Sequence, residues 1–248
     1  LNYKVMKIFH IPAFHDNYIW AVQNGDFISL VDPGDANVSL DIIKSKNLIL
    51  QDILITHHHY DHTGGVNALK KFMKGTVYGP KDCIFDGIEV PLVENDTLKT
   101  LGYCFKVLET PGHTLDHICY YNQEDKILFC GDTLFSAGCG RLFEGTYDQM
   151  HDSLQKINSL PAETKLFCTH EYTLANLNFA LSQINDSEIA KEFKYLESKQ
   201  GGRFISLPTT IKKERKINLF LLEKRIPELS HLSDLDYFSE LRQRKDSF

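Results

Sequence analysis

A run of seven residues, Thr56-His57-His58-His59-Tyr60-Asp61-His62, holds four of the chain's 11 histidines. His57 and His59 are two residues apart, so on an extended loop both imidazoles can point the same way. Neutral imidazole is a good ligand for zinc and similar divalent metals. Asp61 and His62 can turn to a second ion, and a carboxylate beside a histidine makes the open kind of site that hydrolysis requires. The run therefore predicts a hydrolytic metal site.

Three later loops repeat the pattern of an apolar run followed by a residue of metal-ligand type. These residues are His113, Asp132 and His170. Each signal is weak by itself, because a lone loop histidine is more often an ordinary polar residue. Four strand ends that each offer a ligand form a constellation, and together they favour a metal centre. His58 should point away from its neighbours, and we expect it to support the structure instead of binding metal.

The elements around the first loop place it at the carboxyl end of a strand. The apolar run Asp52-Ile53-Leu54-Ile55 predicts a buried strand, and Val66 to Phe72 predicts a helix. In α/β sheets, sites are built at the carboxyl ends of strands. Further strands are predicted at 4–9, 18–23, 27–31, 76–78, 88–90, 103–109, 117–121, 127–130 and 165–168, and further helices at 38–46, 174–181, 187–199 and 232–242. Asn24-Gly25 predicts a hairpin.

The chain changes character near residue 172, where predicted strands give way to predicted helices. We therefore expect a catalytic domain over residues 1–172 and a helical, substrate-binding domain over residues 173–248. Hydrophobic residues at 42% and charged residues at 24% are typical of a globular protein. No apolar run approaches the ~20 residues of a membrane span, and no signal-peptide core is visible, so we expect no membrane partner.

Charge and cysteine content narrow the partners and the compartment. A net charge of -6 argues against nucleic acid as a partner. The six cysteines are scattered and form no Cys-x-x-Cys pair, which is typical of reduced thiols in a cytoplasmic protein. A nucleophilic role is left open only for Cys139, which lies in a glycine-rich loop. We expect a cytoplasmic monomer that acts on a small molecule.

These motifs carry a resemblance to a known family. Thr-His-x-His-x-Asp-His, Pro-Gly-His-Thr, Gly-Asp-Thr-Leu-Phe and a late histidine resemble the metallo-β-lactamase superfamily. A closer resemblance is to glyoxalase II, the family of hydroxyacylglutathione hydrolases. It is carried by residues 16–20, 32–35, 139–146 and 170–173 and by the C-terminal run 241–246. The resemblance covers nearly the whole chain. It implies an α/β (α+β) fold, a four-layer αββα sandwich with a C-terminal helical domain.

The resemblance also implies a role for each ligand-type residue. One metal would be held by His57, His59 and His113, the other by Asp61, His62 and His170, with Asp132 as the bridge. The family implies two divalent ions per chain, with zinc expected and iron or manganese also compatible with the ligands. Glutathione contacts carry over to Arg141, Phe143, Tyr172, Arg242 and Lys245. Phe143 stands where some members have tyrosine, so one hydroxyl contact to the peptide would be absent.

The implied activity is hydrolysis of S-D-lactoylglutathione to D-lactate and glutathione, the second step of methylglyoxal detoxification. A metal-bridging hydroxide would attack the thioester carbonyl, with Asp61 and Asp132 as the catalytic carboxylates. The alternative is a mononuclear iron persulfide dioxygenase of the same superfamily, against which the long tail with Arg242 and Lys245 argues. A nuclease would need a basic surface, a β-lactamase would be exported, and a non-catalytic relative would have lost ligands.

Overall fold

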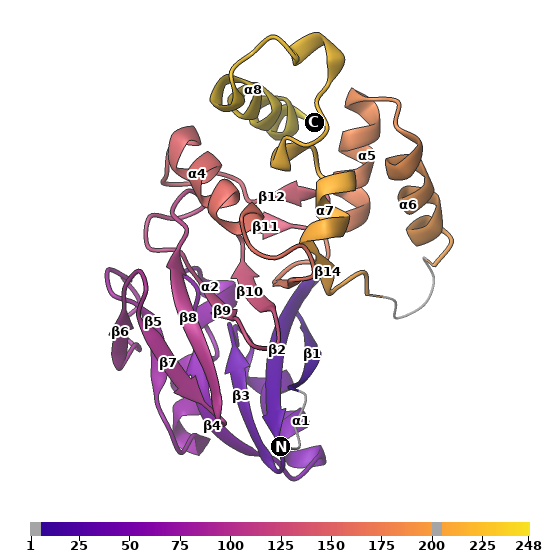
Figure 1. Ribbon diagram of the computed structural model, residues 1–248. Coiled ribbons are helices and arrows are strands. Elements are labelled where there is room, and N and C mark those ends of the chain that lie inside the picture. Colours follow the sequence, from indigo (N-terminus) through magenta and orange to yellow (C-terminus); the bar gives the residue numbers. More distant parts are fainter. Residues whose placement is uncertain (1–5, 200–204) are drawn as a thin grey trace. The chain divides into compact units, whose positions relative to one another are not determined.

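The computed structural model describes residues 6–199 and 205–248, and the chain divides into two compact units (Figure 1). The first comprises Leu1–Glu109 and Asp116–Gly131. The second comprises Thr110–Leu115 and Asp132–Phe248. The loop with His113 thus belongs to the second unit, although the strands on either side of it belong to the first. Among the described residues, no helix has both the length and the apolar character needed to cross a membrane.

A mixed sheet of six strands forms one layer of the first unit. Its strands, in spatial order, are β1 (Lys7–Ala13), β2 (Asn17–Asn24), β3 (Phe27–Val31), β4 (Ile49–Leu54), β5 (Val77–Pro80) and β6 (Val90–Leu92). β1 to β3 pair antiparallel, and β3 to β6 pair parallel. The predicted hairpin at Asn24-Gly25 joins β2 to β3, and Gly25 takes the positive φ of 63° that such a turn favours.

Helices cover one face of this sheet because their apolar side chains enter its core. α1 (Ala36–Ser45) begins at its N-cap Asp35, whose carboxylate accepts from the backbone N–H of Asn37. Its Ile43 joins a buried cluster that includes Ile28, Ile53 and Val66. Val66 begins α3 (Val66–Leu69), which continues as the 3-10 turn η1 (Lys70–Phe72). The short α2 (Tyr60–Thr63) follows β4 directly.

The first unit contributes four antiparallel strands to a second sheet. They are β7 (Thr97–Thr100), β8 (Tyr103–Glu109), β9 (Ile118–Asn122) and β10 (Ile127–Gly131). The Thr100 hydroxyl on β7 lies 2.6 Å from the Ser29 hydroxyl and 2.5 Å from an Asp52 carboxylate oxygen of the first sheet. The Tyr120 hydroxyl donates to the carbonyl of Ile55 across 2.6 Å. These buried hydrogen bonds set the spacing of the two sheets.

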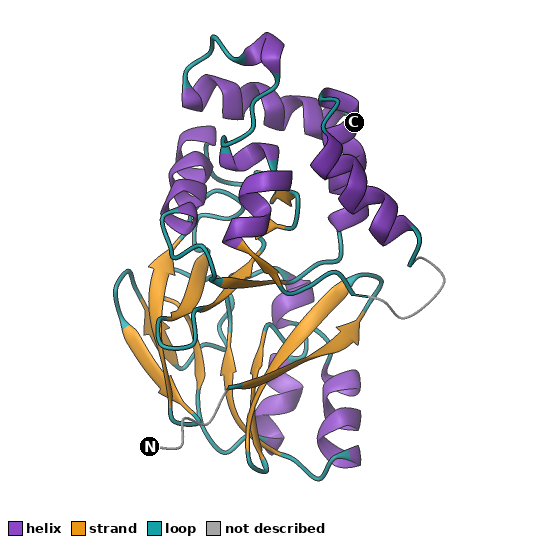
Figure 2. Cartoon of the chain, turned by 45° about the vertical axis from the view of Figure 1, so that its right-hand side comes forward, coloured by secondary structure: helices purple, strands orange, loops and turns teal. Residues whose placement is uncertain are grey.

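The second unit is mostly helical (Figure 2). Its helices are α4 (Tyr147–Asn158), α5 (Thr173–Gln183), α6 (Ser187–Glu197), α7 (Ile211–Ile217) and α8 (Asp234–Ser247), with 3-10 turns η2 (Leu219–Leu221) and η3 (Pro227–Leu229). Its short strands are β11 (Leu134–Phe135), β12 (Gly138–Cys139), β13 (Lys165–Cys168) and β14 (Thr209–Thr210). Phe179, Phe220 and Phe238 are fully buried in its core.

The structure agrees with most predicted elements and adds some. β7, α4 and α7 were not predicted. α4 begins with a capping box, in which Thr146 and Gln149 exchange side-chain and backbone hydrogen bonds, so Thr-x-x-Gln was a usable signal. The predicted strand 4–9 begins at Lys7 within the described residues and runs on to Ala13, while residues 4 and 5 lie outside them. The last helix begins two residues later than predicted, after its N-cap Ser233.

Candidate metal centre

The first cluster lies on the loop after β4, and Asp32 anchors that loop. Asp32 Oδ1 accepts from the backbone N–H of Thr56 and its Oδ2 accepts from the Thr56 hydroxyl, both across 2.8 Å. Asp32 is buried and has a positive φ of 52°. Asp32 thus ties the end of β3 to the end of the parallel neighbour β4. In the sequence, residues 32–35 are only one of the stretches similar to glyoxalase II, so this supporting role of Asp32 was missed.

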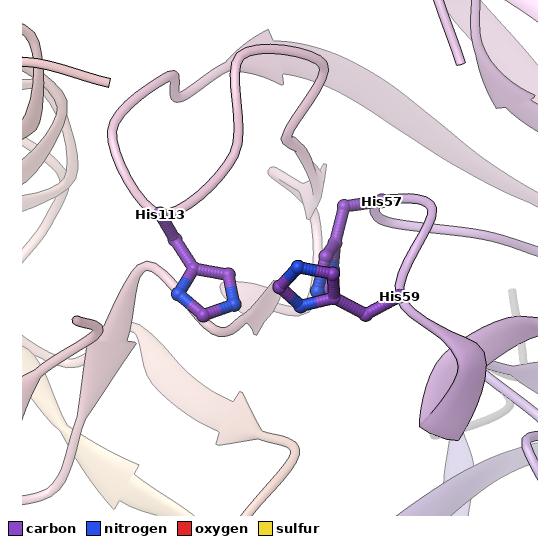
Figure 3. A group of neighbouring side chains, drawn as sticks. All are labelled: His57, His59 and His113. Carbon is purple, nitrogen blue, oxygen red and sulfur yellow. The ribbon is translucent and has the colours of Figure 1, made fainter. Parts of the chain in front are cut away.

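His57 and His59 lie side by side on this loop (Figure 3), with ring centroids 4.7 Å apart. Each offers a ligand atom, and these atoms are within 4.8 Å of one another. The Thr56 hydroxyl gives its hydrogen to Asp32, so it accepts from His57 Nδ1 across 3.0 Å. The ring hydrogen of His57 is therefore on Nδ1, and Nε2 keeps a lone pair that can bind a metal.

Asp61 and His62 extend the cluster from α2. His62 is fully buried, and its Nδ1 lies 3.0 Å from Asp32 Oδ2, which favours the tautomer with hydrogen on Nδ1. Its Nε2 lies 3.5 Å from Asp61 Oδ2, an oxygen that also accepts from the amide of Asn17 across 2.8 Å. In the neutral imidazole this Nε2 is an acceptor that faces a carboxylate. The His62 Nε2 lone pair and the Asp61 carboxylate, 3.5 Å apart, could both bind one cation.

His58 takes no part in this arrangement. Its Nδ1 lies 3.0 Å from Asp116 Oδ1, and both side chains are largely buried. This partner is what a supporting histidine would have, as the sequence predicted. A further histidine that the sequence did not single out, His117, stacks on His57 with ring centroids 4.9 Å apart and is fully buried. His117 lies just before β9, and the sequence there gives no periodic signal that would separate it from an ordinary strand residue.

A second cluster, in the second unit, consists of His113, Asp132 and His170. Asp132 Oδ2 lies 3.4 Å from His113 Nε2 and 3.3 Å from His170 Nε2, and all three residues are buried. His113 Nδ1 donates to the carbonyl of Arg141 across 2.7 Å, which leaves a lone pair on Nε2 facing Asp132. The His170 ring stacks on Tyr172 at 4.8 Å with an interplanar angle of 4°.

The turn before His113 depends on Gly112. Its φ is 149°, and a Cβ built there would lie 2.7 Å from the Cβ of Met150 on α4. Any other residue would be strained and would push α4 away. The loop 110–115 therefore packs against α4, a helix that the sequence did not predict. This packing fixes the position of His113.

The donor set of each cluster fits a divalent metal. Imidazole lone pairs and carboxylates are the ligands that zinc, iron and manganese share. At His57 and His113 a hydrogen bond to the other ring nitrogen holds the tautomer that a metal needs. Figure 3 shows His57 and His59 on one loop and His113 on its own. The structure thus brings together, within each unit, the ligands that the sequence had selected.

The predicted substrate residues lie in the second unit, and Asp246 joins two of them. Asp246 Oδ1 is 2.9 Å from Arg242 Nη2 and 3.4 Å from Arg141 Nε. The Arg141 side chain is 59% exposed, whereas Arg242 is buried and also donates to the carbonyl of Cys139 across 3.1 Å. We expected both α8 cations to be displayed to substrate. The structure shows Arg242 engaged inside the unit, and Asp246 as a neighbour that spacing alone did not reveal.

Lys245 is one turn along α8 from Arg242. Its ammonium lies 3.4 Å from the carbonyl of Ala175 and 5.0 Å from the centre of the Phe179 ring. Burial, followed by the charge of Arg242, holds the pKa of Lys245 below its ordinary 10.5. The lysine therefore loses its proton at a lower pH than a solvated lysine would.

Two neighbouring residues complete the picture of this surface. Phe143 is 63% exposed and presents its ring to the edge of His113, with centroids 5.3 Å apart. Cys139, left open as a nucleophile, is buried, and burial raises the pKa of its thiol despite the nearby Arg242 charge. A protonated, buried thiol is a poor nucleophile, so the structure argues against that role.

Two family models match the chain, one for each part. The model described as Metallo-beta-lactamase superfamily matches residues 13–82 and 75–170, and the one described as Hydroxyacylglutathione hydrolase C-terminus matches residues 171–248. The solved structure of ETHE1 from Myxococcus xanthus has a TM-score of 0.68 with 22% identity, over 97% of this chain and 90% of its own. That likeness confirms the predicted fold class, an α/β metallo-β-lactamase fold with a C-terminal helical region.

Curated relatives match over their full length. The hydroxyacylglutathione hydrolase of Klebsiella pneumoniae is 45% identical over 253 residues, covering 98% of this chain and all of the relative. The hydroxyacylglutathione hydrolase of Hamiltonella defensa is 46% identical over 252 residues, with the same coverage. Identity at this level over whole chains, together with both family models, shows that the chain is an enzyme that belongs to the hydroxyacylglutathione hydrolase (glyoxalase II) family of the metallo-β-lactamase superfamily.

Proposed function

We propose that this enzyme hydrolyses S-D-lactoylglutathione to D-lactate and glutathione, the second step of methylglyoxal detoxification. The observation that carries the proposal is the match of residues 171–248 to the hydroxyacylglutathione hydrolase C-terminus. That part of the chain contains Arg242 and Lys245, beside a superfamily core that supplies the metal ligands. A hydrolytic metal centre and a C-terminal helix that carries Arg242 and Lys245 suit a glutathione thioester, which is anionic and has an electrophilic carbonyl.

We further propose two divalent ions per chain. One would be held by His57, His59 and His113, the other by Asp61, His62 and His170, with Asp132 shared. Zinc is the metal that we favour, and iron or manganese suits the same ligands. When bound, such ions supply Lewis acidity that lowers the pKa of a coordinated water from ~15.7 towards ~7 and polarises a carbonyl. Support comes from the tautomers held at His57 and His113.

The chain's own residues orient the reactants. Asp61, held by the amide of Asn17, accepts a hydrogen bond from the nucleophilic water. This bond points the lone pair of the water at the thioester carbon. Hydrolysis forms a carbon–oxygen bond and breaks the carbon–sulfur bond. Glutathione leaves as a thiolate and takes up the proton that the water has lost. Asp132 and the Tyr172 ring hold the His170 imidazole in place during the reaction.

The proposed glutathione contacts are Arg141, Phe143, Tyr172, Arg242 and Lys245. Lys245 and the exposed Arg141 offer charge to a carboxylate, while Arg242 supports them through Asp246. Phe143 offers a ring face in place of a tyrosine hydroxyl. We retain 1–172 as the catalytic domain and 173–248 as the substrate-binding domain, and the family match from residue 171 supports that boundary.

A mononuclear iron persulfide dioxygenase remains the rival function. It would need one ion and would consume oxygen. The full-length relatives named hydroxyacylglutathione hydrolase favour the thioesterase.

The test combines metal analysis with a substrate panel. The purified protein is assayed on S-D-lactoylglutathione, on a simple acyl thioester without glutathione and on glutathione persulfide, with oxygen uptake followed in parallel. We expect two ions per chain and preferential cleavage of the glutathione thioester. Oxygen uptake on the persulfide with no thioester cleavage would move the protein to the dioxygenase class.

We also propose a monomer in the cytoplasm that binds no nucleic acid. None of the six cysteines, which all lie in the described part of the chain, forms a disulfide, and this suits a reducing compartment. The net charge of -6 disfavours a polyanionic partner. Sedimentation equilibrium at several concentrations measures the mass, and cell fractionation measures the compartment.

A further inference from the structure

A fully buried carboxylate lies outside both ligand clusters and outside the proposed glutathione contacts. Glu214 on α7 has none of its surface exposed. Its Oε1 accepts from the hydroxyls of Ser136 and Thr209, across 2.8 Å and 2.6 Å. Its Oε2 accepts from the backbone N–H of Ala137 across 2.7 Å and from the amide of Asn218 across 3.2 Å. Four donors thus converge on one side chain.

A buried carboxylate is costly unless donors surround it. Burial raises the pKa of Glu214, and the hydrogen bonds from Thr209, Ala137 and Ser136 act in the opposite direction. A buried carboxylate with this many donors fixes the positions of the groups that donate to it.

The partners that Glu214 holds form a hairpin. β11 and β12 pair Phe135 with Gly138, and the turn between them is Ser136-Ala137. Ala137 has a positive φ of 58°, a conformation that is strained for a residue with a side chain and persists only where the surroundings impose it. Glu214 bonds both residues of this turn. The carboxylate therefore imposes the turn from the side of α7.

Two amides complete the hold on the hairpin. Asn218 donates to the carbonyls of Phe135 and Gly138, across 3.2 Å and 3.0 Å. Asn176 on α5 donates to the carbonyl of Ser136 across 3.0 Å. The hairpin's backbone is thus bonded from α5, from α7 and from the turn after α7.

The hairpin in turn touches the proposed metal and glutathione residues. The centre of the Phe135 ring lies 5.7 Å from that of the His170 ring and 5.1 Å from that of the Tyr172 ring, and both pairs are T-shaped. The carbonyl of Cys139 on β12 accepts from Arg242. Just after the hairpin, the backbone N–H of Gly140 donates to the carbonyl of Thr133, the residue after Asp132. A shift of this hairpin would move a ligand, its stacking partner and a proposed substrate residue together.

We propose that Glu214 is a positioning residue that holds the 134–139 hairpin, and through it the His170 imidazole, in the geometry that metal binding requires. This inference rests on the metal site given under the proposed function. Residues behind metal ligands change metal affinity by about 10–100-fold when they are removed. We expect an effect of that size at Glu214, although it touches no ligand directly.

The test uses two substitutions at Glu214 and a matched control. Glu214→Gln keeps one oxygen for Ala137 and Asn218, and the hydroxyls of Ser136 and Thr209 can turn to accept from its amide. Glu214→Leu removes every acceptor. The control is Asp52→Asn, at a buried carboxylate of the first unit that accepts from Thr76 and Thr100 and bonds no residue of the hairpin.

Zinc affinity is measured by competition with a chromophoric chelator, without substrate. We expect Glu214→Leu to lower the affinity for at least one ion about 10–100-fold, with activity partly restored by excess zinc. We expect Glu214→Gln to stay within about threefold of the parent. Asp52→Asn should lower the melting temperature and leave zinc affinity unchanged. Unchanged zinc affinity in Glu214→Leu, with only a lower melting temperature, would overturn the inference.

A second pair of variants covers the case in which Glu214→Leu does not fold. Ser136→Ala removes one of the four donors, and Phe135→Leu leaves the Glu214 bonds intact but removes the ring beside His170. Both should weaken zinc binding. Parental zinc affinity in both would also overturn the inference. A parent that binds zinc but cleaves no thioester would reject the proposed function and leave this inference standing, whereas a parent that binds no metal would reject both.

Discussion

Individual residues in the two clusters owe their chemistry to their hydrogen-bond partners. The Thr56 hydroxyl accepts from Nδ1 of His57, and the Arg141 carbonyl accepts from Nδ1 of His113. In each neutral imidazole, Nε2 therefore keeps the lone pair that can bind a metal. The residue type alone leaves the tautomer open, because either ring nitrogen can carry the hydrogen. The partners are therefore as much part of the site as the ligands.

Asp132 is the residue whose loss should matter most, since both His113 and His170 face its Oδ2. We expect Asp132→Ala to reduce the bound metal from two ions to one or fewer and thioesterase activity at least 100-fold, because His113 and His170 would both lose the carboxylate that they face. Elemental analysis and initial rates on the same sample check this. Asp125→Ala, in a turn between β9 and β10, serves as the control. One tightly bound ion in the parent, with full activity, would contradict the binuclear site.

Lys245 predicts a pH dependence for glutathione binding. Its pKa is lowered by burial and then by Arg242, while Cys139 and Asp246 act to raise it. The protonated form binds the carboxylate, so affinity is complete below this pKa and falls as pH rises through it. KM for the thioester should therefore begin to rise below pH 10.5, the ordinary lysine value. Lys245→Arg, which stays charged, should keep KM flat over that range. An identical alkaline rise in Lys245→Arg would assign the titration to another group.

At the scale of elements, α8 carries two of the five proposed glutathione contacts. Arg242 and Lys245 are three residues apart, so both emerge on the same side of the helix. The helix continues to Ser247, so these residues are not part of a frayed end. Arg242 also packs over the Phe220 ring, which joins α8 to the apolar core of the unit.

Substitutions on α8 should separate binding from chemistry. A charge-assisted hydrogen bond contributes ~1.5–3 kcal/mol, so Lys245→Ala should raise KM by a factor of roughly 10 to 150 and change kcat little. Arg242→Ala should raise KM similarly and also lower the melting temperature, because it leaves Asp246 and the Cys139 carbonyl without their buried partner.

Arg244→Ala is the matched control on the same helix, since Arg244 pairs with Glu240 and Glu228 instead. Steady-state kinetics of the three variants decide between the roles. An unchanged KM for both Lys245→Ala and Arg242→Ala would mean that α8 is only structural.

At the scale of the whole molecule, metal should stabilise the fold. Ions that bind the native state alone raise the free energy of unfolding, by about 4.1 kcal/mol per site at 1,000 times Kd. For a chain of 248 residues this corresponds to roughly 8–16 °C in melting temperature. Chelation should lower the melting temperature by that order, and zinc should restore it while magnesium should not. The same treatment of Asp132→Ala should give a smaller shift. Equal melting temperatures with and without chelator would contradict a tightly held metal.

The sequence by itself determined the family and most of the strands, and it predicted the ligand set. Apolar runs ending in His or Asp are local patterns, and local periodicity is what one chain displays. The confirmed fold class and enzyme family follow from those motifs. The helices α4 and α7 were not predicted, and the reasons differ. α4 has helical spacing in its buried Met150, Leu154 and Ile157 beside its capping box, so its signal was present, whereas α7 has only seven residues, fewer than the window that periodicity needs.

Only the tertiary structure decided which residues hold the ligands in place. Asp32 meets Thr56 across 24 positions, and Glu214 meets Ser136 across 78. Arg242 is predicted to bind substrate, and only the structure shows that its guanidinium also donates to the carbonyl of Cys139, 103 positions away. Such contacts have no period and no fixed spacing, because they depend on where the packed core brings distant segments. Burial then sets the pKa of Lys245 and Glu214, and burial is a property of the folded chain alone.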